Sequence, residues 1–366
     1  MDVFLHYWFF CCGKKKSILN SSTGIIWQIN SWENSVMKLN HIELLVCPKT
    51  NRPLKIKGSP IVVSNLIKDG MLIEPISGNQ YPIINFIPRF VPQDNYAKGF
   101  GFQWNIHNRT QHDKYSGLSA SKDRFEKETK WGHNLKGEKI LEVGCGAGRF
   151  TTHALDTGAL VVSFDYSNAV EANYLSNGNH ENLLLIQADV YEMPFPKNFF
   201  NKAFCFGVLQ HTPDPKRAFM NIVSHLRPGG KIASDIYSKN IVRYYLHAKY
   251  WVRPFTKGSD PEKLYNAVKK YVNFMWPLTK ALRRIPKVGN ALVWRLLVAD
   301  HSPDLPDADD STLKEWAVLD TFDMLSPAYD KPQTMKTFKS WHLSAGLIDI
   351  DVRRGYNGYE GRGIKN

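Results

Sequence analysis

A short glycine-rich segment after an apolar run limits the folds open to this chain more than any other feature. Residues 140–150 read Ile-Leu-Glu-Val-Gly-Cys-Gly-Ala-Gly-Arg-Phe, so the run ends in glycines at Gly144, Gly146 and Gly148. Glycine permits a tight turn and a close approach to a ligand that a side chain would block. The free N–H groups at the start of a following helix would face the same ligand. The segment therefore predicts a cofactor site at the end of a buried strand.

The rest of the chain alternates between apolar, strand-like runs and helical stretches, which is typical of a parallel sheet with crossover helices. The pattern predicts five strands, a mainly helical insert over 239–322, a helix near 334–345 and two closing strands. The predicted strands are 139–144, 161–165, 183–189, 202–208, 231–237, 348–354 and 359–364. The predicted fold class is α/β: a seven-stranded, doubly wound, mostly parallel sheet with a small N-terminal β-rich module and a helical insert.

Acidic residues lie beside the predicted loop and at the ends of the next two strands. Glu142 precedes the loop, where a carboxylate suits a cationic ligand. Asp165 ends the second strand, in a position to accept hydrogen bonds from ribose hydroxyls. Asp189 ends the third strand, in a position to accept from an adenine amino group, with Val190 near the ring.

In this order, the motifs resemble those of class I S-adenosylmethionine-dependent methyltransferases that act on small molecules. The resemblance implies S-adenosylmethionine as the cofactor and a Rossmann-like core over 136–238, closed by 323–366. It implies these cofactor-binding residues: Glu142, Gly144, Gly146 and Gly148 at the methionine end, Asp165 at the ribose, Asp189 and Val190 at the adenine, and Gly207 beneath the sulfonium.

Two alternatives to this assignment come from other classes of protein. A dinucleotide-binding oxidoreductase is disfavoured because the glycine spacing is Gly-x-Gly-x-Gly in place of Gly-x-Gly-x-x-Gly, and no hydride-transfer residues are visible. A non-catalytic relative or regulatory subunit of the same fold is disfavoured by the intact cofactor motifs.

His211 is the candidate base if the acceptor is a hydroxyl that must lose a proton. It follows the fourth predicted strand, at the strand end where ligands bind in such sheets. The competing interpretation is that it holds the turn at 212–213. Asp235, Tyr237 and Asp323 are also expected on the acceptor side. No Asn/Asp-Pro-Pro-Tyr-like segment follows the fourth strand, which disfavours methylation of a nucleic-acid base.

The predicted insert at 239–322 is basic and aromatic. The whole chain has a net charge of +13, and residues 239–300 hold 13 Lys and Arg against 3 Asp and Glu. Three interpretations stay open: a helical lid, a surface that rests on an anionic membrane near a lipid-like acceptor, and a surface for an acidic polymer or nucleic acid. No apolar run reaches the roughly 18 residues of a membrane-spanning helix.

Residues 37–92 consist of short apolar pieces separated by turn residues, which predicts a small β-rich module. The segments Cys47-Pro48, Tyr81-Pro82-Ile83 and Ile87-Pro88 resemble a zinc-ribbon-like family that includes small activator subunits of methyltransferases. The positions that correspond to its zinc ligands are Cys47, Thr50, Glu74 and Ser77. Zinc needs four Cys or His ligands, so no metal is expected.

Two further segments complete the predicted organisation. Residues 93–135 form a bridge in which Gln103 and Trp104 are expected to fold over the cofactor pocket, before a helix near 121–131. Residues 1–36 are predicted to be a poorly ordered extension, with Met37 as a candidate start. Five scattered cysteines favour a reducing, cytoplasmic compartment, and the basic insert adds the periphery of a membrane as a second location.

The whole layout resembles methyltransferases associated with surface-polysaccharide or lipid modification. The resemblance implies O-methylation of a sugar, a lipid-linked molecule or another small-molecule acceptor, with membrane contact through 239–300. An RNA- or protein-directed methyltransferase and a non-catalytic regulatory protein stay open as alternatives.

Overall fold

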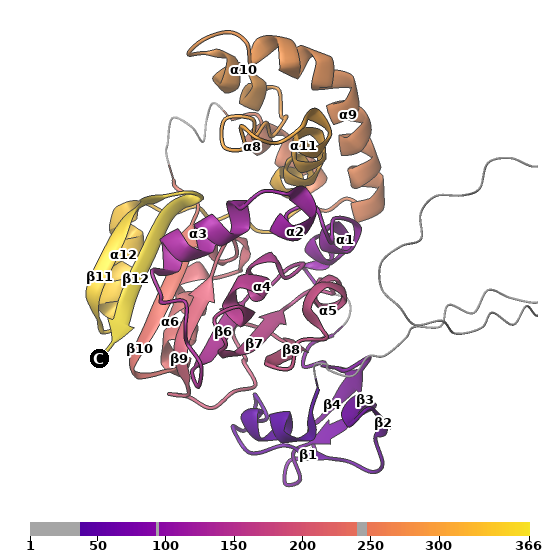
Figure 1. Cartoon of the computed structure of the whole chain (residues 1–366), viewed down its shortest axis with the longest axis vertical. Coiled ribbons are helices and arrows are strands. Elements are labelled where there is room, and N and C mark those ends of the chain that lie inside the picture. The colour runs from indigo at the N-terminus through magenta and orange to yellow at the C-terminus, as the bar shows by residue number, and fades with distance from the viewer. Residues whose placement is uncertain (1–36, 93–94, 240–246) are drawn as a thin grey trace, which may run out of the picture. The chain divides into compact units, whose positions relative to one another are not determined.

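The computed structural model describes residues 37–92, 95–239 and 247–366. At their centre is a seven-stranded sheet with the strand order β11-β12-β10-β9-β6-β7-β8 (Figure 1). Its strands are β6 (Lys139–Val143), β7 (Leu160–Asp165), β8 (Leu183–Gln187), β9 (Phe200–Cys205), β10 (Leu226–Ile236), β11 (Leu347–Gly355) and β12 (Gly358–Lys365). Only β12 runs antiparallel to its neighbours in this sheet. The predicted seven-stranded, mostly parallel sheet is confirmed.

The central strands are apolar on both faces because helices cover both sides of the sheet. Leu141, Val162 and their neighbours belong to one core, to which helices α6 and α12 contribute. Ile140, Val161 and their neighbours belong to a second core, on the side of α3, α4 and α5. These helices are α3 (Ala120–Thr129), α4 (Arg149–Leu155), α5 (Val170–Asn177), α6 (Pro215–His225) and α12 (Met335–Ser344).

The order of the strands places a binding site near β6. The chain builds the sheet from β6 outward through β7 to β8, and then returns to add β9 on the other side of β6. Open parallel sheets bind ligands at the carboxyl ends of the strands where the direction of building reverses. That point lies between β6 and β9. Gly144 follows β6 directly in the chain, and Gly207 lies two residues after the end of β9.

Several strand boundaries differ from the prediction, and two of the differences affect the segments around the site. Strand β10 begins at Leu226, before the predicted Lys231, because the Pro-Gly-Gly segment between them is taken up by a register shift against β9. Strand β9 ends at Cys205, so that Phe206 and Gly207 leave the sheet as a loop.

The helical insert has a hydrophobic core of its own. Val272 and Trp276 of α9 pack with Trp316 and Phe322 of α11. Helix α9 begins at an Asp-Pro pair, in which the Asp260 carboxylate accepts a hydrogen bond from the backbone N–H of Lys263. The helices are α8 (Lys249–Thr256), α9 (Pro261–Leu282), α10 (Gly289–Arg295) and α11 (Asp310–Leu325). None of the helices in the described part of the chain has the length and apolar character needed to cross a membrane.

The N-terminal segment forms a separate antiparallel sheet. The elements are a 3-10 turn (Leu39–Leu44) and strands β1 (Lys55–Ile56), β2 (Ile61–Val63), β3 (Leu66–Ile73), β4 (Gln80–Ile84) and β5 (Ile87–Pro88). The Glu74 carboxylate accepts hydrogen bonds from Thr50 Oγ1 at 3.4 Å and from the Ser77 backbone N–H at 2.9 Å. Three of the four positions that correspond to zinc ligands therefore meet through hydrogen bonds, while the resemblance to a zinc ribbon stays a prediction. The predicted extension over 1–36 lies outside the described residues.

Candidate functional site

A cavity of about 530 Å³ opens at the carboxyl ends of β6, β7 and β9. Its walls come from the loops after these strands, from helix α1 (Lys98–Ile106) with the segment that follows it, and from the insert. The predicted site residues that line it are Gly144, Gly146, Asp165, Val190, Gly207 and His211. The structure therefore brings six of the predicted residues to one cavity.

The glycine loop has a left-handed backbone at all three glycines, with φ of +75° at Gly144, +51° at Gly146 and +86° at Gly148. A Cβ atom at Gly144 would lie 2.3 Å from Val208 Cγ2, so this glycine is needed for packing beneath the cavity. A Cβ atom at Gly146 would lie 3.1 Å from the indole nitrogen of Trp104, which packs across the loop. The loop thus lies between the strands and α1. Gln103 and Trp104 of α1 both line the cavity.

Asp165 lies at the end of β7 and faces the cavity. Its Oδ2 accepts a hydrogen bond from the Gly146 N–H at 3.0 Å. Its Oδ1 accepts from the Ser167 backbone N–H at 2.8 Å and from Ser167 Oγ at 2.7 Å. Burial raises the pKa of Asp165, and the hydrogen bonds from Ser167 and Gly146 oppose that shift. The carboxylate is therefore held rigidly beside the glycine loop.

Glu142 does not line the cavity, and its predicted contact with the ligand stays a prediction. Glu142 Oε2 accepts hydrogen bonds from Thr151 Oγ1 at 2.5 Å and from Ser163 Oγ at 2.6 Å. Burial raises the pKa of Glu142 to about 7, against the lowering effect of the bonds from Ser163 and Thr151. Since Thr151 belongs to α4 and Ser163 to β7, this carboxylate ties together the elements that flank the loop.

Gly148 and Asp189 are also absent from the described residues that line the cavity. A Cβ atom at Gly148 would lie 2.2 Å from Asn173 Oδ1, so the requirement for glycine there comes from packing against α5. Asp189 Oδ1 accepts a hydrogen bond from the Tyr191 N–H at 2.8 Å, which stabilises the turn after β8. Val190, the next residue, lines the cavity instead.

The sequence places Asp235 on the acceptor side, but both of its carboxylate oxygens bind other groups of the protein behind the cavity. Its Oδ1 accepts a hydrogen bond from the Gly207 N–H at 2.6 Å, and its Oδ2 pairs with the Arg124 guanidinium. It is buried and does not line the cavity, although Arg124 and Gly207 do. Asp235 therefore holds the loop after β9 in place.

His211 reaches the cavity from the 3-10 turn Leu209–His211 that follows β9. Its Nδ1 lies 3.0 Å from the backbone carbonyl oxygen of Tyr329. A carbonyl only accepts, so Nδ1 is the donor, and the neutral ring keeps its lone pair on Nε2. The ring contacts Phe100 at 5.1 Å and Tyr237 at 5.4 Å between centroids.

Helix α1 supplies residues that the sequence did not assign as a helical face. Phe100, Gln103 and Trp104 of this helix line the cavity, together with Tyr96 before it and His107 after it. Gln103 is fully buried, and neither its amide oxygen nor its amide nitrogen has a hydrogen-bond partner in the described part of the chain. Buried polar groups are normally paired, so this amide indicates a ligand with polar atoms in the cavity.

The insert and α11 form the far wall. Trp294, His301, Asp304, Asp320 and Asp323 all line the cavity. His301 Nε2 lies 2.5 Å from Asp320 Oδ2. Burial lowers the pKa of His301, but Asp320 and Asp304 outweigh that effect and raise it to about 9. This wall therefore combines aromatic rings with carboxylates.

Comparisons with known proteins agree with this geometry. Residues 141–234, which include the glycine loop, Asp165, Val190, Gly207 and His211, match the family model described as "Methyltransferase domain". Residues 141–234 therefore resemble a methyltransferase domain.

Two curated relatives of this methyltransferase domain show how far the likeness extends. The chain is 27% identical to an O-methyltransferase of Aspergillus nomiae over 36% of this chain and 63% of the relative. It is 28% identical to a demethylmenaquinone methyltransferase of Corynebacterium kroppenstedtii over 46% of this chain and 77% of the relative. The chain thus spans less than two thirds of the Aspergillus protein's length.

Among solved structures, the chain resembles an O-methyltransferase family protein from Burkholderia thailandensis. The sequence identity is 8%, the TM-score is 0.42, and the match covers 74% of this chain and 64% of that chain.

S-adenosylmethionine is the cofactor of this class of methyltransferase domain, and the cavity fits it. The left-handed glycine at Gly146 leaves room where a side chain would meet Trp104. Asp165 offers a buried carboxylate, and Gln103 offers an unpartnered amide in the same cavity. Arg149 adds a cation beside the loop, since burial and Arg124 lower its pKa only to about 10.

Proposed function

We propose that the chain is an S-adenosylmethionine-dependent O-methyltransferase whose acceptor is a sugar, a lipid-linked molecule or another small molecule with a hydroxyl group. The observation that carries this proposal is the placement of His211. Its Nδ1 is tied to the Tyr329 carbonyl, so the lone pair on Nε2 is available in a cavity that also contains the cofactor loop. A hydroxyl acceptor requires a positioned base because it must lose a proton. An acceptor that has no proton to lose does not require one.

We assign the cofactor to the half of the cavity near β6 and β7. Gly144 and Gly146 form the loop, Asp165 accepts from the ribose, and Val190 packs near the adenine. Gly207, held by Asp235, lies beneath the reacting centre. When bound, S-adenosylmethionine supplies an electrophilic methyl group on a sulfonium. The protein's part is to align the acceptor and to exclude water.

Arg149 and Glu142 have different roles in this assignment. Arg149 lies in the cavity and stays cationic at neutral pH, so it suits the carboxylate at the methionine end. Glu142 keeps the shape of the loop through Thr151 and Ser163 without facing the ligand. Its removal would act through the position of the loop.

The acceptor is assigned to the wall formed by the insert and α11. Tyr237, whose hydroxyl donates to Asp323 Oδ2 at 3.4 Å, lies between His211 and this wall. Trp294 offers an apolar face, and the carboxylates of Asp320 and Asp323 accept from hydroxyl groups. A sugar or a lipid-linked polyol has both an apolar face and several hydroxyl groups, which matches this set of side chains.

Calorimetric titration tests the cofactor half of the proposal. The purified chain is titrated with S-adenosylmethionine, with NADH and NADPH as controls. Binding of the methyl donor alone supports the proposal, and binding of a dinucleotide alone contradicts it.

A second assay tests the acceptor half. Release of S-adenosylhomocysteine is measured with a panel of sugar, lipid-linked, RNA and peptide acceptors. Turnover on a hydroxyl acceptor that falls sharply in His211→Gln supports O-methylation with His211 as the base. Turnover confined to RNA or peptide acceptors would assign the chain to one of the other substrate classes.

A further inference from the structure

Helix α9 carries exposed apolar side chains beside the face that it buries. Leu264, Val268, Val272 and Trp276 are buried in the core of the insert. The adjoining side carries Ala267, Tyr271, Phe274, Leu278 and Ala281, all exposed and spaced by alternating steps of four and three residues. This spacing aligns them in one stripe along the helix. Phe274 is 81% exposed in this stripe.

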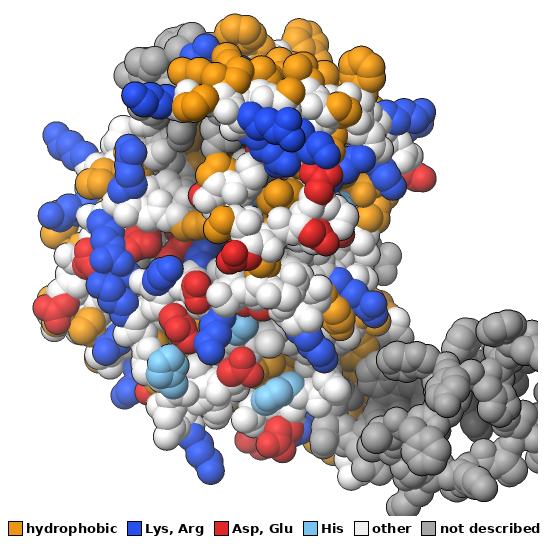
Figure 2. Space-filling model, turned by 45° about the horizontal axis from the view of Figure 1, so that its top comes forward, with side chains coloured by type: hydrophobic (Ala, Val, Ile, Leu, Met, Phe, Trp, Pro, Cys, Tyr) orange, Lys and Arg blue, Asp and Glu red, His pale blue; other side chains and the backbone are white. Residues whose placement is uncertain are grey.

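The neighbouring helices of the insert extend the apolar surface. On α8, Trp251 is 63% exposed and Phe255 is 85% exposed, one helical turn apart. Near and within α10, Val288 and Leu292 are also exposed. In Figure 2 the hydrophobic side chains gather over the top of the molecule, bordered by Lys and Arg side chains. An apolar area of this kind on a soluble surface marks an interaction site.

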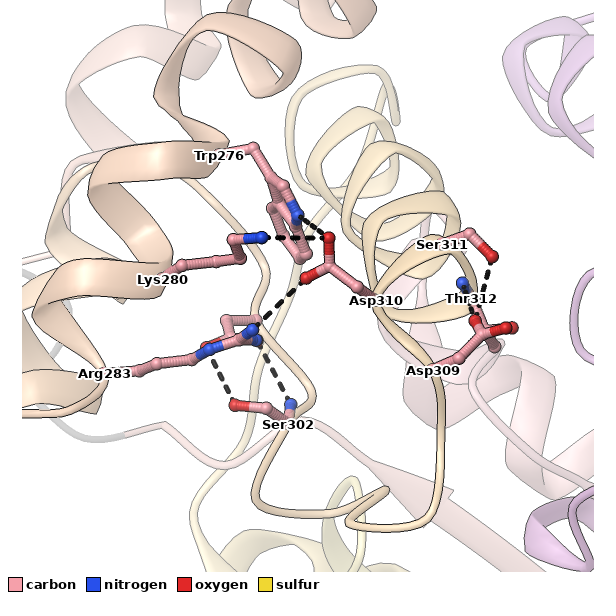
Figure 3. Close-up of polar contacts among 9 residues, drawn as sticks. Trp276, Lys280, Arg283, Ser302, Asp309, Asp310, Ser311 and Thr312 are labelled. Carbon is pink, nitrogen blue, oxygen red and sulfur yellow. Dashed lines mark hydrogen bonds and ion pairs between the residues drawn. The ribbon is translucent and has the colours of Figure 1, made fainter.

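The cations of the insert divide into two groups by their contacts. Trp276, Lys280 and Arg283 converge on Asp310 at the start of α11, with Lys280 Nζ 3.3 Å and Arg283 Nη2 3.4 Å from its carboxylate (Figure 3). Lys249 and Arg253 of α8 pair with Asp330, which follows α11 in the chain. Two of these four cations therefore hold α9 against α11, and the other two hold α8 against the segment after α11.

The second group of cations faces outward. Its members are all exposed, and none takes part in an ion pair or a side-chain hydrogen bond among the residues that the structure describes: Lys257, Lys263, Lys269, Lys270, Arg284, Lys287 and Arg295. The exposed acids of 247–300 are only Asp260 and Glu262, and Asp260 already caps α9. The surface around the apolar stripe therefore has a strong positive excess.

We propose that this face of the insert, formed by α8, α9 and α10, docks on the surface of an anionic membrane. The Phe, Trp and Leu side chains enter the boundary between headgroups and acyl chains, while the outward lysines and arginines contact anionic headgroups. Long basic side chains reach past an apolar stripe to a charged layer without breaking its contact with lipid. A second copy of this chain would bring two positive faces together, so charge complementarity favours the membrane over a dimer.

The docking face and the catalytic cavity share the same helices. Lys249 and Tyr250 of α8 line the cavity, whereas Trp251 on the same helix faces outward. Trp294 of α10 lines the cavity, whereas Leu292 faces outward. Docking would therefore place the acceptor wall next to the lipid headgroups. This last step rests on the proposed function, while docking itself does not.

Cosedimentation of the full chain with lipid vesicles tests docking without any enzyme assay. Mixed phosphatidylglycerol–phosphatidylcholine vesicles are compared with pure phosphatidylcholine vesicles, at low and at raised salt. We expect binding to the anionic vesicles that weakens as salt screens the lysines, and little binding to the neutral ones. Failure to bind anionic vesicles at low salt would overturn the proposal.

Two variants of the face separate its apolar and charged parts. The double variant F255S/F274S and the double variant K263Q/K270Q are each expected to weaken binding about tenfold or more. Matched controls are Leu175→Ser on α5 and Leu343→Ser on α12, which are 65% and 61% exposed outside the insert and should bind like the wild type. Equal loss in variants and controls, or no loss in either double variant, contradicts docking through this face.

The same variants identify a different occupant. If sedimentation equilibrium shows a dimer that F255S/F274S dissociates, the face is an interface between copies and the proposal is wrong. Tight binding to RNA that K263Q/K270Q removes and F255S/F274S leaves intact, without binding to anionic vesicles, would also overturn it. Because none of these measurements uses turnover, a failure of docking stays distinct from a failure of the proposed methyl transfer.

Discussion

His211 Nδ1 lies 3.0 Å from the backbone carbonyl oxygen of Tyr329, which fixes the tautomer of this histidine. Tyr329 follows α11 in the chain, so the segment after this helix orients the candidate base.

We expect His211→Gln to lower kcat on a hydroxyl acceptor by about 10²–10⁴-fold, because the variant loses the base at Nε2. The dissociation constant for S-adenosylmethionine should stay unchanged in calorimetry. His133→Gln, at an exposed position, is the matched control. An unchanged kcat in His211→Gln would assign this residue to support of the turn at 212–213.

The glycine loop predicts a contrast between two alanine variants. Gly144→Ala places a methyl group 2.3 Å from Val208 Cγ2 at a left-handed φ, so it should lower the free energy of unfolding by about 2–4 kcal/mol. Gly146→Ala shares the strain of a left-handed φ but meets only the edge of the Trp104 ring, at 3.1 Å, so it should destabilise the fold less and also weaken cofactor binding. Denaturant unfolding and calorimetry on both variants measure the contrast. Adding Val208→Ala should restore part of the stability lost in Gly144→Ala, and no recovery would argue against the clash.

Asp165 and Asp189 should differ in their effect on the cofactor. Asp165 lines the cavity, so Asp165→Asn is expected to weaken S-adenosylmethionine binding by about 10–100-fold through loss of a charge-assisted hydrogen bond. Asp189 bonds the Tyr191 N–H outside the lining, so Asp189→Asn should weaken binding much less. Both dissociation constants come from the same titration. Equal losses of S-adenosylmethionine affinity in the two variants would support the direct contact between Asp189 and adenine that the sequence predicts.

Glu142 should make stability depend on pH over a defined window. Its pKa is about 7 in the folded chain against an ordinary value of 4.5, so the folded state binds the proton more tightly. The stabilising contribution is complete below pH 4.5 and is lost as the pH rises through 7, by about 3 kcal/mol in total.

The test compares Glu142→Gln with the wild type by urea unfolding from pH 4.5 to 8. Since glutamine does not ionise, the stability of the variant relative to the wild type should rise across this window. Glu262→Gln, at an exposed site on α9, should show no such trend. A difference that stays constant with pH would contradict burial of an ionisable Glu142.

The sequence predicted the seven strands because their apolar runs reflect burial on both faces of the sheet. It missed α1, whose glycines disfavour a helix when judged locally. The structure gives the reason at Gly101, where a Cβ atom would lie 3.1 Å from the Asn168 backbone nitrogen. A helix that must approach another backbone this closely needs glycine, and that neighbour is distant in the chain. The packing requirement is therefore invisible in the local pattern.

The site residues divide in a similar way. The sequence placed Gly144, Gly146, Asp165 and Gly207 at strand ends, and the topology alone brings strand ends together. The side-chain direction of Glu142 depends on its partners Thr151 and Ser163, which come from a helix and a neighbouring strand. A one-dimensional motif contains no information on such partners, so the role of Glu142 became visible only with the fold.

The two walls of the cavity occupy different stretches of the chain, and this separation makes them separable by design. The family match covers 141–234, which includes the glycine loop, and ends before the insert. The wall with Trp294 and Asp320 lies in the chain between β10 and β11. A chimaera that carries another methyltransferase's segment in place of 247–325 should therefore keep its affinity for the methyl donor while choosing a new molecule to methylate.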